Sequence, residues 1–224
     1  MELNDLTVIL LTANRVPKDW AEYHLRVLKE AIGNTRLITI SREQMPHTTL
    51  LDTEPLSYHN IYYQMLRGAR ITKTPYVAIA EDDTLYHETH FTAFRPCDDE
   101  FAYNRNRWSL FTWGVPTYSI KERISNCSLV APTDLMVEAL TERYNKHPDG
   151  GDVVGELGKR RTERHLRVTQ RKQVDFYSAF PIVQFNHDFA HDNVQVNHKK
   201  KMGMIRAFDI PVWGRAEELV KEFK

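Results

Sequence analysis

Hydrophobic and polar positions in the N-terminal part of the chain predict strands and helices in alternation. Leu6–Thr12 is a continuous apolar run rich in β-branched residues, which predicts a parallel strand buried on both faces. Residues 20–32 carry apolar side chains at helical spacing, with Asp19 as the expected N-cap and Gly33 as the expected end. Residues 36–41 predict the next strand, so the order is strand, helix, strand, the unit that builds parallel sheets.

A second helix and a third strand follow an irregular stretch at residues 45–55. Residues 57–71 have a helical pattern that ends before Pro75, and Tyr76–Ala80 predicts a buried strand. Three acidic residues, Glu81, Asp82 and Asp83, come directly after this strand. Because ligands gather at the carboxyl ends of strands in open α/β sheets, the three carboxylates are the first candidate site.

The second half of the chain has a looser pattern. It predicts strands at residues 107–113, 128–131 and 176–185, and helices at residues 132–144, 152–171 and 215–223, the second interrupted near Gly155 or Gly158. Pro181 argues against a central position for the last strand. We expect a single α/β domain over residues 1–224, with a nucleotide-binding half at 1–95 and a mixed half at 96–224.

Composition narrows the class of protein. The chain has 224 residues, of which 42% are hydrophobic and 27% charged, and this excludes a disordered or collagen-like chain. Two cysteines, Cys97 and Cys127, form neither a zinc-finger spacing nor a disulfide framework. The acidic first residues are not typical of a secretory signal, and no run of 18 apolar residues predicts a membrane span. We therefore expect a cytoplasmic protein.

A net charge of zero conceals a basic region. Residues 159–172 contain seven Lys or Arg and one Glu, and residues 199–201 are three lysines. Without these two segments, 20 basic and 29 acidic residues remain, a net charge of −9. The basic region is either a solvated helix face or a surface that attracts a polyanion.

The acidic triplet suggests a divalent cation. Adjacent carboxylates repel one another and raise one another's pKa unless a cation lies between them. Their hard oxygen ligands suit Mg²⁺ or Mn²⁺, which bridge to substrate phosphates. The alternative is an exposed acidic turn that caps the next segment.

The N-terminal pattern resembles the nucleotide-sugar glycosyltransferases of the GT-A fold. The resemblance rests on the strand ending in Thr12-Ala13-Asn14-Arg15, the helix with Asn60 and Arg67-Gly68-Ala69, and the strand ending in Glu81-Asp82-Asp83, and it covers about the first 95 residues. The family motif is Asp-X-Asp, so Glu81 departs mildly from it. The resemblance implies a mixed sheet with a Rossmann-like nucleotide-binding half, and an acceptor-binding half that ends in a flap and a helix.

The resemblance also implies roles for individual residues. Asp83 would bind Mn²⁺ or Mg²⁺, and Glu81 or Asp82 would face the ribose of a nucleoside-diphosphate sugar, with UDP as the expected nucleotide. The nucleotide pocket would be lined by Thr12, Asn14, Arg15, Asn60 and Gln64. A bound cation would stabilise the charge that develops on the leaving diphosphate.

Histidine and lysine residues near the C-terminus extend this implied site. His187 follows the predicted strand directly and is the first choice for a further cation ligand, with His191 as the second. Both could equally be ordinary loop histidines. Lys199 lies in a polar segment suited to a flap that closes over a diphosphate.

A catalytic base is needed only by an inverting enzyme. Asp152 and Glu156, in the glycine-containing segment at 149–156, are the candidates for accepting the proton of the acceptor hydroxyl. For Asp152 the alternative is a helix N-cap. A retaining enzyme needs no such base, and the sequence leaves both outcomes open.

The acceptor is predicted from the basic region. Arg160, Arg164, Arg167 and Arg171 fall on one face of a predicted helix, which suits DNA as the acceptor. Small phage enzymes of this general type modify hydroxymethylated bases. A base flipped out of the duplex could stack on Trp113, or on Tyr103 or Trp108, unless these are core residues. The rival acceptor is a saccharide or a lipid-linked glycan.

Two other classes of protein remain as alternatives. A non-catalytic nucleic-acid-binding α/β protein is disfavoured because a carboxylate cluster repels phosphate. A nucleotidyltransferase usually has a glycine-rich loop near its start, and none follows the first predicted strand here.

Overall fold

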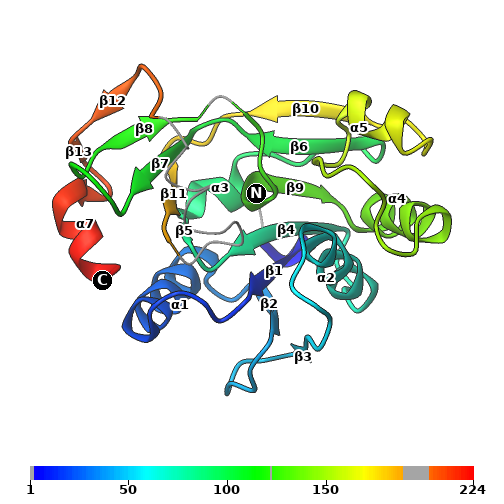
Figure 1. The fold of residues 1–224 in the computed structure, drawn as a ribbon, viewed down its shortest axis with the longest axis horizontal. Coiled ribbons are helices and arrows are strands. Elements are labelled where there is room, and N and C mark those ends of the chain that lie inside the picture. Colours follow the sequence, from blue (N-terminus) through cyan, green and yellow to red (C-terminus); the bar gives the residue numbers. More distant parts are fainter. Residues whose placement is uncertain (1–2, 122, 189–201) are drawn as a thin grey trace.

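The computed structural model describes residues 3–121, 123–188 and 202–224 of the chain (Figure 1). Within these residues the helices are α1 (Lys18–Ile32), α2 (Tyr58–Arg70), α3 (Glu88–Thr92), α4 (Thr133–Lys146), α5 (Arg160–His165) and α7 (Ala216–Glu222). The strands are β1 (Leu6–Thr12), β2 (Arg36–Ser41), β3 (Leu50–Leu51), β4 (Tyr76–Glu81), β5 (Thr84–Leu85), β6 (Glu100–Asn104), β7 (Arg107–Phe111), β8 (Tyr118–Ile120), β9 (Leu129–Pro132), β10 (Lys172–Phe176), β11 (Ile182–Asn186), β12 (Arg206–Ala207), β13 (Asp209–Ile210) and β14 (Gly214–Arg215).

The large sheet has the strand order β10-β6-β9-β4-β1-β2-β3. Strands β1 to β4 are parallel, β9 is antiparallel to both β4 and β6, and β10 is parallel to β6. All strands of this sheet except β9 therefore end at the same side, which we call the carboxyl edge, and begin at the opposite amino edge. This mixed α/β sheet, opened by a β-α-β unit, is the GT-A-like fold class that the sequence predicts.

Helices cover both faces of the large sheet, which explains why β1 is apolar throughout. Ile9 and Leu11 pack into a core cluster with α2 and α4, whereas Leu6, Val8 and Leu10 pack with α1 and α3 on the other face. Helix α2 approaches β1 closely at Gly68, where an added Cβ would lie 2.7 Å from a methyl carbon of Ile9. This contact fixes α2, and with it the side chains that α2 presents at the carboxyl edge.

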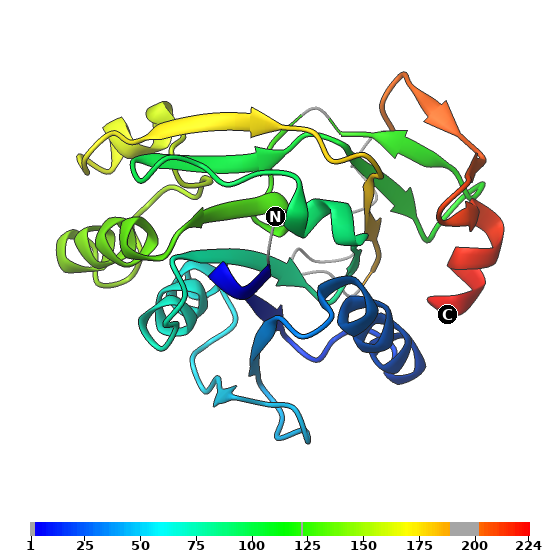
Figure 2. The same cartoon turned by 180° about the vertical axis from the view of Figure 1, so that it is seen from behind.

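A smaller sheet, with the order β12-β8-β7-β11-β5, lies beside the carboxyl edge (Figure 1). Figure 2, from the opposite side, shows α7 next to this sheet and far from α4 and α5. Strand β11 lies between β7 and β5, so the expectation that Pro181 keeps it from a central position was wrong. The proline immediately precedes the strand, and its missing N–H costs no ladder hydrogen bond.

Several predicted boundaries differ from the structure. The helix predicted at 152–171 is reduced to α5, because Gly158 and Arg167 have positive φ angles of 76° and 52° and strand β10 begins at Lys172. Helix α1 has Pro17 rather than Asp19 at its N-cap, with no side-chain cap. Strands β6 and β8 were not predicted. In residues 3–121, 123–188 and 202–224, no helix has the length and apolar character of a membrane span.

Candidate active site

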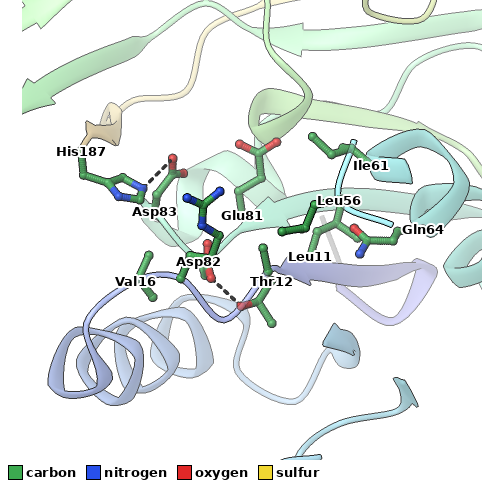
Figure 3. Close-up of a pocket in the computed structure, with 12 residues that line it drawn as sticks. Leu11, Thr12, Val16, Leu56, Ile61, Gln64, Glu81, Asp82, Asp83 and His187 are labelled. Atoms are coloured by element: carbon green, nitrogen blue, oxygen red, sulfur yellow. Dashed lines mark hydrogen bonds and ion pairs between the residues drawn. The ribbon is translucent and has the colours of Figure 1, made fainter. Parts of the chain in front are cut away.

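The three predicted carboxylates leave β4 at the carboxyl edge but point toward different partners (Figure 3). Asp82 Oδ2 accepts a hydrogen bond of 2.5 Å from the Thr12 hydroxyl. Glu81 Oε2 accepts one of 3.2 Å from Gln184 Nε2. Asp83 Oδ2 lies 3.8 Å from Nε2 of His187. The three carboxylates therefore contact three different partners.

A cavity at this edge brings seven of the predicted site residues together (Figure 3). Its walls come from β1 and its exit loop, from the start of α2, from the end of β4 and from the residue after β11. The residues that line this cavity are Leu11, Thr12, Ala13, Arg15, Val16, Leu56, Ile61, Gln64, Glu81, Asp82, Asp83 and His187. We call it the edge cavity.

The backbone of the acidic turn is held from two sides. The indole Nε1 of Trp20 on α1 donates to the carbonyl of Asp82 over 2.8 Å. The Phe185 N–H donates to the carbonyl of Asp83, also over 2.8 Å. These bonds satisfy buried carbonyl groups and fix the direction of the acidic side chains.

Burial shifts the acidity of two of the carboxyl groups. Burial, together with the nearby charges of Asp83 and Asp82, raises the pKa of Glu81 to about 8. Burial also raises the pKa of Asp82 to about 7. A cation in the cavity would favour the ionised forms and lower both pKa values.

Asp83 and His187 are the residues that fit a divalent cation. Within the described part of the chain, no group of three or more His, Cys, Asp or Glu side chains is arranged to hold a metal ion. However, Mg²⁺ and Mn²⁺ bound to nucleotides typically take one or two protein ligands and complete their shell with phosphate oxygens and water. The facing carboxylate and imidazole match that smaller ligand set.

Aromatic packing fixes the orientation of His187. The histidine is only 3% exposed, and its ring lies 4.9 Å from that of Phe223, just after α7. Phe223 in turn packs on Phe185 at 4.9 Å and on Trp20 at 4.8 Å. The end of the chain thus supports the histidine from behind.

Asn14 and Asn60 do not line the edge cavity. Asn14 has a φ angle of 54°, and its Oδ1 accepts hydrogen bonds from Ser41 and from the backbone after β2. Asn60 is buried and donates to Asp52 over 2.8 Å. Both amides shape the loops around the cavity, which leaves Thr12, Arg15 and Gln64 as the predicted nucleotide-binding residues that face it.

The two candidate bases differ in their surroundings. Asp152 is exposed, pairs with His165 at 3.1 Å and caps no helix, because the N-cap of α5 is Lys159. Glu156 pairs with Lys159 at 3.4 Å, and its negative charge contributes to the raised pKa of Glu81. Of the two candidates, Glu156 is therefore the one whose charge affects the pKa of a residue in the acidic turn.

The basic segment is not one helical stripe. Arg160 and Arg164 are exposed on α5, and Arg167 is exposed beyond its end. Arg171 is instead 5% exposed and pairs with Glu138 at 2.9 Å and Glu142 at 3.1 Å. Because α5 precedes β10, it lies toward the amino edge, away from the acidic turn (Figure 1).

The predicted stacking residues are packed to different degrees. Tyr103 is fully buried, and its hydroxyl donates to the Leu157 carbonyl over 2.8 Å. Trp113 is half-buried, with its ring edge-on to Phe111 at 5.4 Å. The predictions for Lys199 and His191 lie outside the described residues.

Sequence reasoning missed two polar residues of the site. Gln184 reaches Glu81 and is held by the buried Arg107, whose guanidinium donates to Gln184 Oε1 over 2.7 Å. Asp52 is buried beneath α2 and accepts from Gln64 over 2.7 Å. Two sequence signals could have identified them. Gln184 is a polar residue within the apolar β11 segment, and the amide residues on α2 need a buried acceptor such as Asp52.

Comparisons with known proteins concern the fold. No protein-family model matches the chain, and no curated protein matches it either. A nucleotidyltransferase from Methanothermobacter thermautotrophicus is similar in structure at a TM-score of 0.46 and 12% identity, covering 79% of this chain and 88% of that one.

Two glycosyltransferase structures are similar to the same degree. The enzyme involved in glycosylation of the major capsid of PBCV-1 has a TM-score of 0.43 and 12% identity, covering 80% of this chain and 91% of that one. A mutant Drosophila beta-1,4-galactosyltransferase 7, in complex with manganese, UDP-Gal and xylobiose, has a TM-score of 0.43 and 9% identity, covering 88% and 82%. The assignment of this chain to the GT-A-like fold class rests on its own strand order.

Proposed function

We propose that the protein is a metal-dependent glycosyltransferase that moves a sugar from a nucleoside-diphosphate sugar, with UDP as the nucleotide, to an acceptor hydroxyl. The observation that carries this proposal is the approach of Asp83 and His187 in a cavity that also contains Thr12 and Gln64. A cation ligand pair and a pocket with apolar and amide groups are the two elements that a nucleoside diphosphate requires.

Three residues of the edge cavity and two further predicted residues would have tasks in this reaction. Asp83 and His187 would hold Mn²⁺ or Mg²⁺, which when bound stabilises the charge on the leaving diphosphate without a proton. Arg15 lines the cavity and supplies a further positive charge for the diphosphate. In an inverting reaction, Glu156 would accept the proton of the acceptor hydroxyl. Lys199 would belong to a flap over the diphosphate.

For the acceptor we propose a hydroxymethylated base in DNA, as in an enzyme that a phage would use in the host cytoplasm. Strand β10 has five residues and therefore spans roughly 16 Å between the two edges of the sheet. One turn of a duplex is about 34 Å long. A duplex could therefore contact the exposed arginines of α5 and also present a flipped base at the carboxyl edge.

A saccharide acceptor is the second candidate. A separate cavity beside α2 and α4 is lined by Tyr63, Tyr144 and Asp149 among others. The two tyrosine rings lie edge to face at 5.4 Å. An aromatic platform next to a carboxylate suits sugar hydroxyl groups and does not suit phosphate.

The direct test offers both acceptors to the enzyme. Purified protein with Mn²⁺ would be incubated with each common nucleotide sugar and with either hydroxymethylated duplex DNA or a panel of oligosaccharides. The masses of the products would be measured by mass spectrometry. Release of the nucleoside diphosphate with a sugar gained by DNA supports the proposal. A nucleotidylated product, or no sugar transfer to any acceptor, contradicts it.

A further inference from the structure

Asp52 forms the most heavily hydrogen-bonded carboxylate around the edge cavity. Its side chain is fully buried and follows β3. Its donors are Asn60 Nδ2 at 2.8 Å, Gln64 Nε2 at 2.7 Å, Arg67 at 3.1 Å and Arg42 at 3.4 Å. Asn60, Gln64 and Arg67 come from successive turns of α2, so one carboxylate ties the β3–α2 loop to that helix.

The hydrogen bond from Gln64 Nε2 to Asp52 sets which way the Gln64 amide faces. A carboxylate only accepts hydrogen bonds, so the NH₂ group of Gln64 must face Asp52. The carbonyl oxygen Oε1 is therefore the amide atom left for the edge cavity that Gln64 lines (Figure 3). Among the described residues, Oε1 has no hydrogen-bond partner.

The surroundings of Oε1 are apolar. Leu11, Leu56 and Ile61 line the same cavity, and Gln64 itself is only 5% exposed. An acceptor that faces such a cavity favours a ligand that brings an N–H donor, because an acceptor placed opposite it would leave two lone pairs facing each other. The edge cavity therefore distinguishes hydrogen-bond donors from acceptors on a ligand.

We propose that Asp52 is a positioning residue that makes the edge cavity selective for keto nucleobases. Uracil and guanine carry a hydrogen on the ring nitrogen of their pairing edge, whereas cytosine and adenine present a lone pair there. Gln64 Oε1 would accept from that N–H. This inference rests on the proposed function, since it concerns the nucleotide of the same donor.

The experiment measures dissociation constants of UDP, GDP, CDP and ADP with Mn²⁺ by calorimetry. Wild-type protein should bind UDP or GDP at least about tenfold more tightly than CDP and ADP, because a ring-nitrogen lone pair opposite Gln64 Oε1 would leave both acceptors without a donor. In Asp52→Asn the new amide can donate to Gln64 Oε1 and turn the NH₂ group into the cavity. The preference should then shrink or invert in favour of CDP and ADP.

A second variant tests the inference even if Asp52→Asn does not fold. Gln64→Met keeps the Asp52 cluster with Asn60 and both arginines but removes the acceptor, so it should weaken the preferred keto nucleotide about tenfold and leave CDP unchanged. Gln173→Met, on the exposed part of β10, is the matched control and should bind as the wild type does.

The outcomes separate the inference from the proposed function. Mn²⁺-dependent binding without a keto preference, or an equal loss for all four nucleotides in Gln64→Met, overturns the inference alone. Keto-selective binding that needs no cation supports the inference and contradicts the metal-dependent function. Failure of the wild type to bind any nucleotide overturns both.

Discussion

His187 Nε2 lies 3.8 Å from Asp83 Oδ2, although the two residues come from opposite halves of the chain. Antiparallel pairing of β11 with β5, in which Gln184 opposes Thr84, sets this relationship. The Phe185 N–H then bonds the Asp83 carbonyl, so the residue after β11 returns to the acidic turn. Sheet pairing thus builds the proposed cation site from two distant segments.

Replacing His187 tests its role as a cation ligand. His187→Ala should weaken Mn²⁺-dependent UDP binding by about tenfold or more, because altering a group in a metal site typically costs that much. Calorimetric titration gives the measurement. His165→Ala, which removes an exposed histidine paired with Asp152, should bind as the wild type does. Normal binding by His187→Ala together with loss in His191→Ala would move the role to His191, and normal binding by both would exclude a histidine ligand.

Phe223 links the chain end to the site. Phe223→Ala should lower the free energy of unfolding by about 3–5 kcal/mol, because the ring is 3% exposed among other aromatic rings. It should also weaken Mn²⁺-dependent UDP binding, since His187 loses its support. Urea unfolding and calorimetry measure the two effects. Phe180→Ala removes a ring that is 42% exposed and serves as the control. Loss of stability with unchanged UDP affinity would show that His187 needs no such support.

The arginines of α5 make a prediction about DNA. If Arg160, Arg164 and Arg167 each neutralise one phosphate, replacing all three with Ala should reduce the slope of log affinity against log salt by about 2.7. Duplex binding across a salt series measures this slope. The control variant replaces Arg26, Lys29 and Arg36 with Ala, which removes the same charge far from α5. The slope should then be unchanged. Absence of DNA binding by the wild type at low salt would leave the saccharide as the acceptor candidate.

Two buried histidines predict acid sensitivity. Burial lowers the pKa of His24 to about 4 and that of His90 to about 3. Both are neutral in the folded protein, whereas the unfolded chain takes up protons near pH 6.5, so their stabilising effect is complete above pH 6.5 and is lost as the pH falls toward 4. At pH 5 each should cost about 2 kcal/mol of unfolding free energy.

Variants isolate this effect from the titrating carboxyl groups. His24→Gln and His90→Gln should each lose about 2 kcal/mol less than the wild type between pH 7.5 and pH 5, as measured by urea unfolding. A pH dependence identical to that of the wild type in both variants would mean that neither histidine is excluded from protonation.

Local patterns were sufficient to predict β1, α1, β2, α2 and β4. Strand β1 has the predicted bounds, Leu6–Thr12, because its sequence must fill two apolar faces at once. The acidic turn follows β4 as expected, since an abrupt change from apolar to acidic residues marks the end of a buried strand. The proximity of Thr12 to Asp82 was implied by the family resemblance, and their hydrogen bond is consistent with it.

Side-chain contacts that follow no helical or strand periodicity explain what the sequence could not predict. The segment at 152–171 has helical charge spacing, yet Glu163 turns inward to accept from the backbone of Gly158 and Arg171, which closes the segment into a short helix. Asp52 looked like one residue of an irregular loop, because its four donors lie elsewhere along the chain. The position of Gln184 depends on a hydrogen bond from Arg107, which lies on another strand. No local sequence pattern indicates that hydrogen bond.

The most direct measurement is the affinity of UDP for the wild type and for Asp83→Ala, with Mn²⁺ and with excess EDTA. The account predicts binding by the wild type that needs Mn²⁺ and is lost in Asp83→Ala. That variant should keep its fold, because the Asp83 side chain belongs to no apolar core cluster of the described residues and accepts a hydrogen bond from the Thr84 hydroxyl. Asp98→Ala, an exposed carboxylate at the amino edge, should behave as the wild type does. Equal UDP affinity in Mn²⁺ and in EDTA, or unchanged Mn²⁺-dependent affinity in Asp83→Ala, would contradict the proposed cation site.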